Sequence, residues 1–201
     1  AWACSTASSV PASPPNETTS VGAQHAPRQR TSTPLTRSAN LDSSPTSMAS
    51  VGGTLFFAAN DGLTGIELWK SDGSAAGTVM VKDLSAGFSS GSPGSLVNVN
   101  GVLFFSANDG GASGQYGLWK SDGTAAGTTK LKGFGAAFDS FPRNLTKVNG
   151  TLFFTVDEGT SGVELWKSDG TVAGTVRVAD IEPGSASSSP QNLIVVNGTL
   201  F

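Results

Sequence analysis

The amino-acid sequence predicts an all-β protein, a β-propeller-like array of four-stranded antiparallel blades. Two repeated phrases support this prediction, and no segment shows the hydrophobic period of a helix. The phrase Leu-Trp-Lys-Ser-Asp-Gly-Ser/Thr-x-Ala-Gly-Thr occurs around Trp69, Trp119 and Trp166. The phrase Gly-Thr/Val-Leu-Phe begins at Gly53, Gly101, Gly150 and Gly198. An interval of about 50 residues indicates units that must stack on their neighbours to bury apolar surface.

Each unit begins with a tight β-hairpin. In the second unit, Leu96-Val-Asn-Val99 leads into Asn100-Gly101, and Val102-Leu-Phe-Phe-Ser-Ala107 leads out. Asn-Gly tolerates the positive φ angles of a two-residue type I′ turn, so these segments are expected to pair as antiparallel strands.

Two further strands complete the unit. Asn108-Asp-Gly-Gly turns the chain into residues 116–121, and Asp122-Gly turns it again into residues 128–132. Gly and Asp are typical of such turns, so four strands form a meander. Segments rich in Gly, Ser and Pro then lead to the next unit, at residues 87–93, 135–142 and 183–190.

The apolar pattern predicts how the units pack. Leu55-Phe-Phe-Ala-Ala59 and its counterparts are continuous apolar runs, which are typical of strands covered on both faces. Radially stacked propeller blades meet this requirement, and a β-sandwich is the alternative. The expected blades span residues 46–93, 94–142 and 143–190, with the first hairpin of an incomplete fourth at residues 191–201.

Residues 1–45 are rich in Ser, Thr, Pro and Ala, which predicts a disordered tail or linker. Because the chain starts with Ala1 and stops inside a repeat, we expect a fragment of a longer protein. Its expected partners include the missing remainder of the propeller, or further copies that associate through open sheet edges. No stretch has the length of a transmembrane helix.

The charge of the chain excludes one class of partner. The formal net charge is −3 and charged residues make up 13% of the chain. Binding to nucleic acid requires clustered positive charge, so nucleic acid is not an expected partner.

The repeated phrase resembles that of the ELWxxDGT repeat proteins. Glu67-Leu-Trp-Lys-Ser-Asp-Gly-Ser74 and Glu164-Leu-Trp-Lys-Ser-Asp-Gly-Thr171 match the consensus, while the middle copy has Gly117 in place of Glu and the first has Ser74 in place of Thr. The resemblance covers residues 46–201. It implies a bacterial, hyalin-like protein that is secreted or displayed on the cell surface, and it supplies no functional residues.

The recurring aspartates are the first candidate metal ligands. Asp72, Asp122 and Asp169 occupy equivalent positions, and a ring of carboxylates binds Ca²⁺ through oxygen. We favour a turn-forming role, because Asp before Gly accepts hydrogen bonds from nearby backbone N–H groups. The same preference for a turn-forming role applies to a second acidic set, at Asn60-Asp61, Asn108-Asp109 and Asp157-Glu158. No cofactor is expected.

The other repeated residues favour structural roles over chemistry. The tryptophans could form a sugar-stacking surface or pack between blades, and we favour packing. Glu67 and Glu164 provide two carboxylates for glycosidase-like chemistry, but Gly117 replaces their counterpart in the middle unit. The only histidine, His25, lies in the tail, so no Ser–His pair can form within the repeats. We therefore do not expect an enzyme.

These observations predict a non-enzymatic scaffold for binding or adhesion outside the cell. Its ligand, an extracellular glycan or protein, would be held by segments 87–93, 135–142 and 183–190, because recognition commonly lies on loops of a rigid framework. The alternative is an accessory propeller fragment of a larger secreted enzyme.

Overall fold

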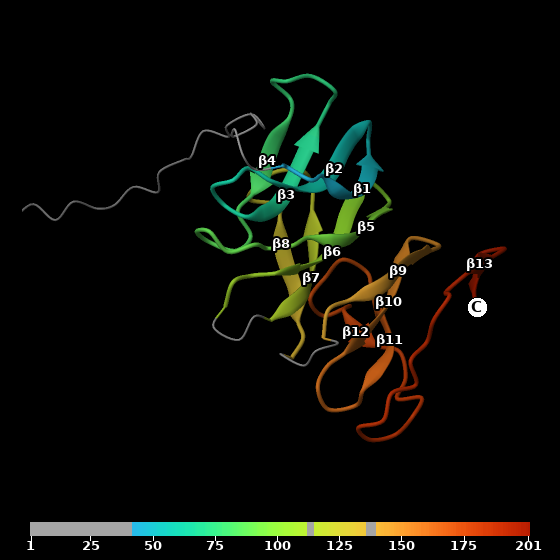
Figure 1. The fold of residues 1–201 in the computed structure, drawn as a ribbon. Coiled ribbons are helices and arrows are strands. Elements are labelled where there is room, and N and C mark those ends of the chain that lie inside the picture. Colours follow the sequence, from blue (N-terminus) through green and yellow to red (C-terminus); the bar gives the residue numbers. More distant parts are fainter. Residues whose placement is uncertain (1–41, 112–114, 136–139) are drawn as a thin grey trace, which may run out of the picture. The chain divides into compact units, whose positions relative to one another are not determined.

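The chain forms short antiparallel strands in the order that the repeats predict (Figure 1). The structure, a computed structural model, describes residues 42–111, 115–135 and 140–201. Within these ranges no helix occurs, and hence none that is long and apolar enough to cross a membrane. Most of the predicted tail, residues 1–41, lies outside the described residues, as do residues 136–139 of segment 135–142.

Three sheets of four strands and one hairpin make up the described chain. The first sheet contains β1 (Thr46–Val51), β2 (Thr54–Asn60), β3 (Ile66–Ser71) and β4 (Val79–Lys82). The second contains β5 (Gly94–Val99), β6 (Val102–Asn108), β7 (Tyr116–Ser121) and β8 (Thr129–Gly133). The third contains β9 (Arg143–Val148), β10 (Thr151–Asp157), β11 (Val163–Ser168) and β12 (Val176–Arg177). β13 (Val195–Val196) pairs with β14 (Thr199–Leu200).

Each sheet is an antiparallel meander in which sequential strands are neighbours. The register repeats as well, because each tryptophan lies opposite a phenylalanine of the preceding strand, in the pairs Phe57 and Trp69, Phe105 and Trp119, and Phe154 and Trp166. Asn100 and Asn149 have φ of 53° and 46°, as an Asn-Gly hairpin turn requires. The predicted all-β, blade-like fold is confirmed.

The core lies between successive sheets. One cluster joins Leu68 and Val81 of the first sheet to Phe105 and Trp119 of the second. A second cluster joins Phe104 and other residues of the second sheet to those of the third, including Leu152, Phe154 and Trp166. The first strands of neighbouring sheets also contact each other, β1 with β5 and β5 with β9. Each sheet therefore depends on its neighbour to bury apolar surface, as expected of stacked repeats.

A repeated set of contacts joins the sheets at their Asp-Gly turns. Lys70 Nζ donates to the Gly123 carbonyl at 2.8 Å, and Lys120 Nζ donates to the Gly170 carbonyl at 2.9 Å. Gly123 has φ of +88°, and a Cβ there would lie 3.1 Å from the Phe56 ring. The glycine of each turn thus permits both the backbone conformation and the approach of the neighbouring sheet.

The structure also contains a feature that the sequence analysis did not anticipate. Ser47, Ser95 and Asn144, each in the first strand of a sheet, have φ between 50° and 53°. The pairing register of the strand shifts at the same place in every sheet. These irregularities are β-bulges, which redirect side chains at the edge of a sheet.

Candidate functional site

The Asp-Gly turns are closed hydrogen-bonded units. Asp122 Oδ1 accepts from the backbone N–H of Thr124 at 2.8 Å and from its hydroxyl at 2.7 Å. The same hydroxyl oxygen accepts from Gly127 N at 2.9 Å, and Thr128 Oγ1 donates back to the Thr124 carbonyl at 2.6 Å. Every polar residue of the repeated phrase after the aspartate is therefore used within its own turn.

The other two turns repeat this geometry at Asp72 and Asp169. The hydroxyl of the Ser or Thr two residues later, followed by its backbone N–H, lowers the pKa of all three aspartates. Across the described ranges, no group of three or more His, Cys, Asp or Glu residues is placed to hold a metal ion. The turn-forming role is what the hydrogen bonds support, and the calcium hypothesis remains a prediction.

Glu67 holds the segment that follows its sheet. Its side chain is fully buried, and its two carboxylate oxygens accept from Leu84 N and Gly91 N, both at 2.7 Å. Burial raises the pKa of Glu67 to about 7. The two backbone donors act to lower this pKa, and the nearby Asp83 charge acts to raise it. The carboxylate therefore fastens the segment containing residues 84–91 to β3.

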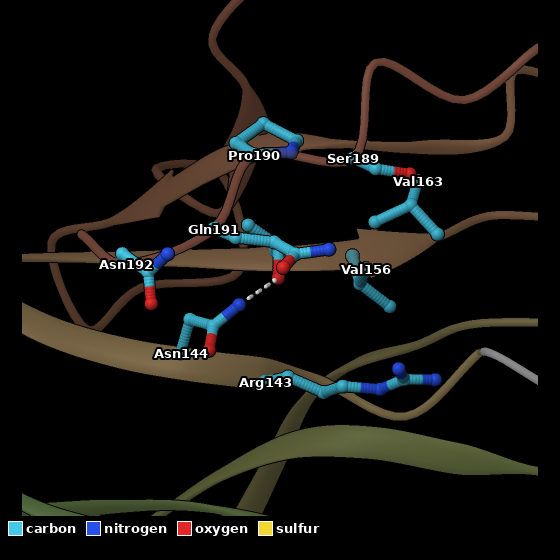
Figure 2. A pocket seen from close by; sticks show the side chains of 9 residues that line it. Arg143, Asn144, Val156, Val163, Ser189, Pro190, Gln191 and Asn192 are labelled. Atoms are coloured by element: carbon cyan, nitrogen blue, oxygen red, sulfur yellow. Dashed lines mark hydrogen bonds between the residues drawn. The ribbon is translucent and has the colours of Figure 1, made fainter.

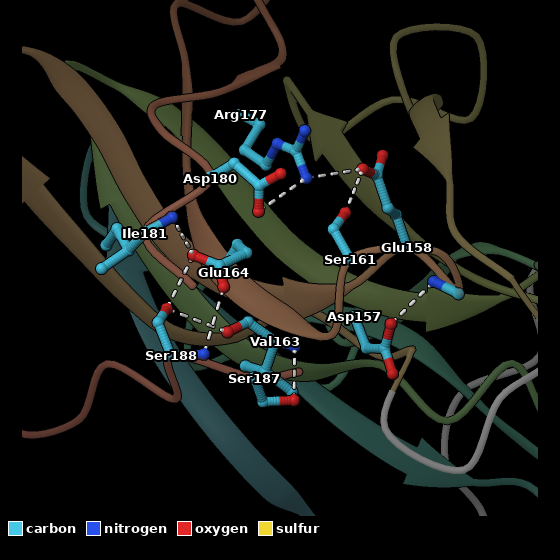
Figure 3. A network of polar contacts seen from close by, with 11 residues as sticks. Asp157, Glu158, Ser161, Val163, Glu164, Arg177, Asp180, Ile181, Ser187 and Ser188 are labelled. Carbon is cyan, nitrogen blue, oxygen red and sulfur yellow. Dashed lines mark hydrogen bonds and ion pairs between the residues drawn. The ribbon is translucent and has the colours of Figure 1, made fainter. Parts of the chain in front are cut away.

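Glu164 holds the equivalent segment of the third sheet, as Figure 3 shows. Its oxygens accept from Ile181 N at 3.2 Å, Ser188 N at 3.1 Å and the Ser188 hydroxyl at 2.6 Å. Desolvation acts to raise the pKa of Glu164, but the Ser188 hydroxyl and the backbone donors outweigh it, so the pKa is lowered. The two glutamates thus serve their own sheets and form no shared pair of carboxylates.

The middle sheet lacks this clamp because Gly117 stands at the same position. A Cβ at Gly117 would lie 2.7 Å from the Lys132 carbonyl, so β8 approaches β7 closely there. A side chain at this position would therefore require β8 to move away.

The tryptophans are core residues. Trp119 and Trp166 lie in the clusters between sheets, as the favoured interpretation expects, whereas Trp69 packs with residues of its own sheet. Trp69, Trp119 and Trp166 are all buried, and exposed rings are what a sugar-stacking surface requires. Lys82 lies over the Trp119 ring at 5.9 Å and Lys132 over the Trp166 ring at 5.2 Å, so each ring meets a lysine of the preceding sheet.

The second acidic set also works locally. Asp61 Oδ1 accepts from Leu63 N and Thr64 N, both at 2.8 Å, and Asp109 forms an ion pair with Lys130. Glu158 accepts from the Ser161 hydroxyl at 2.7 Å and lies 3.3 Å from Arg177 (Figure 3). These residues stabilise turns and strand ends.

A hollow of about 420 Å³ lies on the third sheet, at the bulge of β9. Figure 2 shows that Asn144 and Arg143 form one side and the segment from Ser189 to Asn192 forms the other. The lining residues are Arg143, Asn144, Thr155, Val156, Val163, Ser189, Pro190, Gln191 and Asn192. Three amides, two hydroxyls and a guanidinium thus surround a small apolar patch.

Local contacts position the walls of this hollow. The bulge turns Asn144 so that its Nδ2 donates to Thr155 Oγ1 at 3.0 Å. Ser189 N donates to the Val163 carbonyl at 3.0 Å, which fixes the returning segment against β11. The Arg143 guanidinium stacks on the Phe141 ring at 4.1 Å.

One of the predicted binding segments lines this hollow, and a ligand site in these segments remains a prediction. Segment 183–190 contributes Ser189 and Pro190 to the hollow. Ser92 in segment 87–93 donates its N–H to the Ile66 carbonyl at 2.9 Å, as Ser189 does to the Val163 carbonyl, but it lines no part of this hollow. The sequence analysis missed Asn144 and Asn192. A signal was present, because Ser or Asn follows a proline by two residues in every unit, at Ser47, Ser95, Asn144 and Asn192. His25 lies outside the described residues.

Comparisons with known proteins give one distant structural likeness. No protein-family model and no curated protein matches this sequence. A solved structure of an α-L-arabinofuranosidase from Clostridium thermocellum is similar at 14% sequence identity and a TM-score of 0.31, covering 78% of this chain. The aligned part spans 58% of the length of that enzyme chain. A likeness at this level carries no argument about activity.

Proposed function

We propose that this protein is a non-enzymatic binding scaffold whose ligand occupies the hollow on the third sheet. One observation carries the proposal, namely the contrast between the repeated residues and those that line the hollow. The repeated Asp, Glu and Trp side chains are all used within the framework. Arg143 and Asn144 also contact neighbouring side chains, but they differ between units, since the second unit has Gly94 and Ser95 at these positions.

The lining indicates the kind of ligand. Amide and hydroxyl groups donate and accept hydrogen bonds in fixed directions, while Val156, Val163 and Pro190 offer a small apolar contact. This combination suits a neutral or weakly acidic polar ligand such as an extracellular glycan or an extended peptide. The resemblance to exported repeat proteins supports a location on the cell surface or outside the cell.

The experiment is a binding screen of the full chain against immobilised glycans and peptides, followed by two matched variants. Asn144→Ala should weaken binding of any ligand found by about fivefold or more, because it removes a hydrogen-bonding side chain from the hollow. Ser95→Ala changes the equivalent bulge residue of the second sheet and should leave binding unchanged. Equal effects of the two variants would refute this location of the site.

A second candidate function uses the same hollow differently. The array would hold a polymeric substrate as an accessory part of a larger secreted enzyme, since a polar hollow on a rigid framework serves either purpose. The chain should then bind the polymer without cleaving it, while the longer protein should cleave it. Cleavage by the 201-residue chain itself would contradict both candidates.

A further inference from the structure

One face of the third sheet exposes apolar residues whose counterparts in the other two sheets are buried. Val81 and Leu84 of the first sheet are 6% exposed, and their counterparts Leu131 and Phe134 in the second are 5% and 3% exposed. The counterparts in the third sheet are Val178, at 44%, and Ile181, at 55%. These positions are apolar in every sheet. The third sheet therefore has the residues of a buried face, but no neighbouring sheet in the described part of the chain covers them.

Other residues show the same contrast on this face. Leu68 and Leu118 are completely buried, whereas their counterpart Leu165 is half-buried. Phe153, which corresponds to Phe56 of the first sheet, is also half-buried instead of buried. We call Phe153, Leu165, Lys167, Val178 and Ile181 the open face.

Lys167 provides the polar part of the open face. Lys70 and Lys120 occupy the same strand position, and each donates to a glycine carbonyl in the Asp-Gly turn of the next sheet. Lys167 is exposed, and none of the described residues accepts a hydrogen bond from it. Lys167 thus occupies the strand position from which Lys70 and Lys120 bond to the next sheet, but no Asp-Gly turn of the described chain lies beside it.

The two junctions within the chain define what fits such a face. At the first junction, Lys70 meets the Gly123 carbonyl, while Lys82 donates to the Thr128 carbonyl at 2.7 Å and lies over the Trp119 ring. All three partners belong to the outer hairpin β7–β8 and its turn. At the second junction, Gly170 and Trp166 belong in the same way to β11–β12.

We propose that the open face is an interaction surface for a further repeat unit of this type, which docks through the outer hairpin that carries Trp-Lys-Ser-Asp-Gly. The carbonyl of its turn glycine accepts from Lys167. Its tryptophan covers Leu165, Val178 and Ile181, as Trp119 covers the first sheet in the cluster that it forms with residues of β6.

Hairpin β13–β14 supports this choice of occupant. Its sequence, Val196-Asn-Gly-Thr-Leu-Phe201, is that of the inner hairpin of a unit, and Asn149 Nδ2 donates to the Gly198 carbonyl at 2.7 Å. In every four-stranded sheet the second strand pairs with the outer hairpin. The docking hairpin therefore finds a strand edge at β14 as well as an apolar face, which is the usual arrangement for recognition by strand addition.

The test uses a labelled synthetic peptide of residues 115–133, which includes β7, the Asp-Gly turn and β8, added to the full chain. We expect saturable binding measured by fluorescence anisotropy. Lys167→Met should weaken it by about tenfold, since it removes a charge-assisted hydrogen bond and keeps the length of the side chain. Lys147→Met changes an exposed lysine of β9 and should leave binding of the peptide unchanged.

Three results would overturn the proposal. The first is binding that survives Trp119→Ala in the peptide, and the second is an equal effect of Lys167→Met and Lys147→Met. The third is a failure of the peptide to bind while the chain forms dimers that Lys167→Met dissociates in sedimentation experiments, which would make a second copy the occupant. Circular dichroism of each variant verifies that the sheets are intact.

Discussion

At the scale of single residues, two glutamates at one repeat position ionise differently. Both are buried against backbone N–H groups of a following segment. Glu67 has Asp83 nearby, and burial raises its pKa to about 7, whereas Glu164 gains the Ser188 hydroxyl and its pKa is lowered. The difference arises from the neighbours that the fold brings to each carboxylate.

The dependence of stability on pH should therefore have opposite signs for the two residues. Because the pKa of folded Glu67 exceeds its ordinary value of 4.5, its contribution is fully present below pH 4.5 and is lost as the pH rises through about 7. The stability advantage of the native chain over Glu67→Gln should fall across this window, by up to about 3 kcal/mol.

Glu164→Gln provides the matched comparison. A lowered pKa contributes stability above the ordinary value, which is lost as the pH falls, so the advantage of the native chain over this variant should be larger at pH 7 than at pH 4. Urea unfolding of the three proteins between pH 4 and pH 8 measures both effects. Parallel pH profiles for the two variants would contradict the assignment.

The Asp-Gly turn makes a second prediction at this scale. A Cβ at Gly127 would lie 2.1 Å from Asp122 Oδ1, so Gly127→Ala must displace the carboxylate from Thr124. We expect a loss of about 1–3 kcal/mol in the free energy of unfolding. Gly135→Ala is the control, since its nearest neighbour is the Glu158 carbonyl oxygen at 3.5 Å, and it should change stability by less than about 0.5 kcal/mol.

At the scale of elements, the lysine after each tryptophan links one sheet to the next. Lys120→Met removes the hydrogen bond to the Gly170 carbonyl, and we expect it to lower the free energy of unfolding by about 1–3 kcal/mol. Lys167→Met, at the same strand position on the open face, should have little effect on stability in the absence of a partner. Chemical denaturation of the two variants makes the comparison, and similar losses would show that these lysines act within their own sheets.

At the scale of the whole molecule, each sheet is stabilised by its immediate neighbours. Leu152 is completely buried in the cluster between the second and third sheets, so Leu152→Ala should cost about 2–5 kcal/mol. Because coupling in repeat proteins is between neighbours, hydrogen exchange should accelerate in β7 and β10 more than in β2 and β3. Uniform acceleration in all three sheets would indicate a single cooperative unit.

The strands, their order and the turns follow from the amino-acid sequence. Asn100-Gly101 and Asp122-Gly123 are local signals, because a residue that tolerates positive φ or accepts a hydrogen bond from its close neighbours acts within a few positions of the chain. The repeat of tryptophans and phenylalanines indicated stacking, and Trp119, Trp166 and most of the buried phenylalanines do lie in clusters between sheets.

The positions of the bulges, the glutamate clamps, the hollow and the open face depend on the folded chain. Glu67 bonds to Leu84 and Gly91, and Asn144 lies across the hollow from Asn192, so each feature joins segments that are distant along the chain. The desolvation that raises the pKa of Glu67, and the exposure that distinguishes Val178 from Val81, depend on what packs nearby. Local residue patterns carry no record of that packing, since identical positions in successive repeats receive different neighbours.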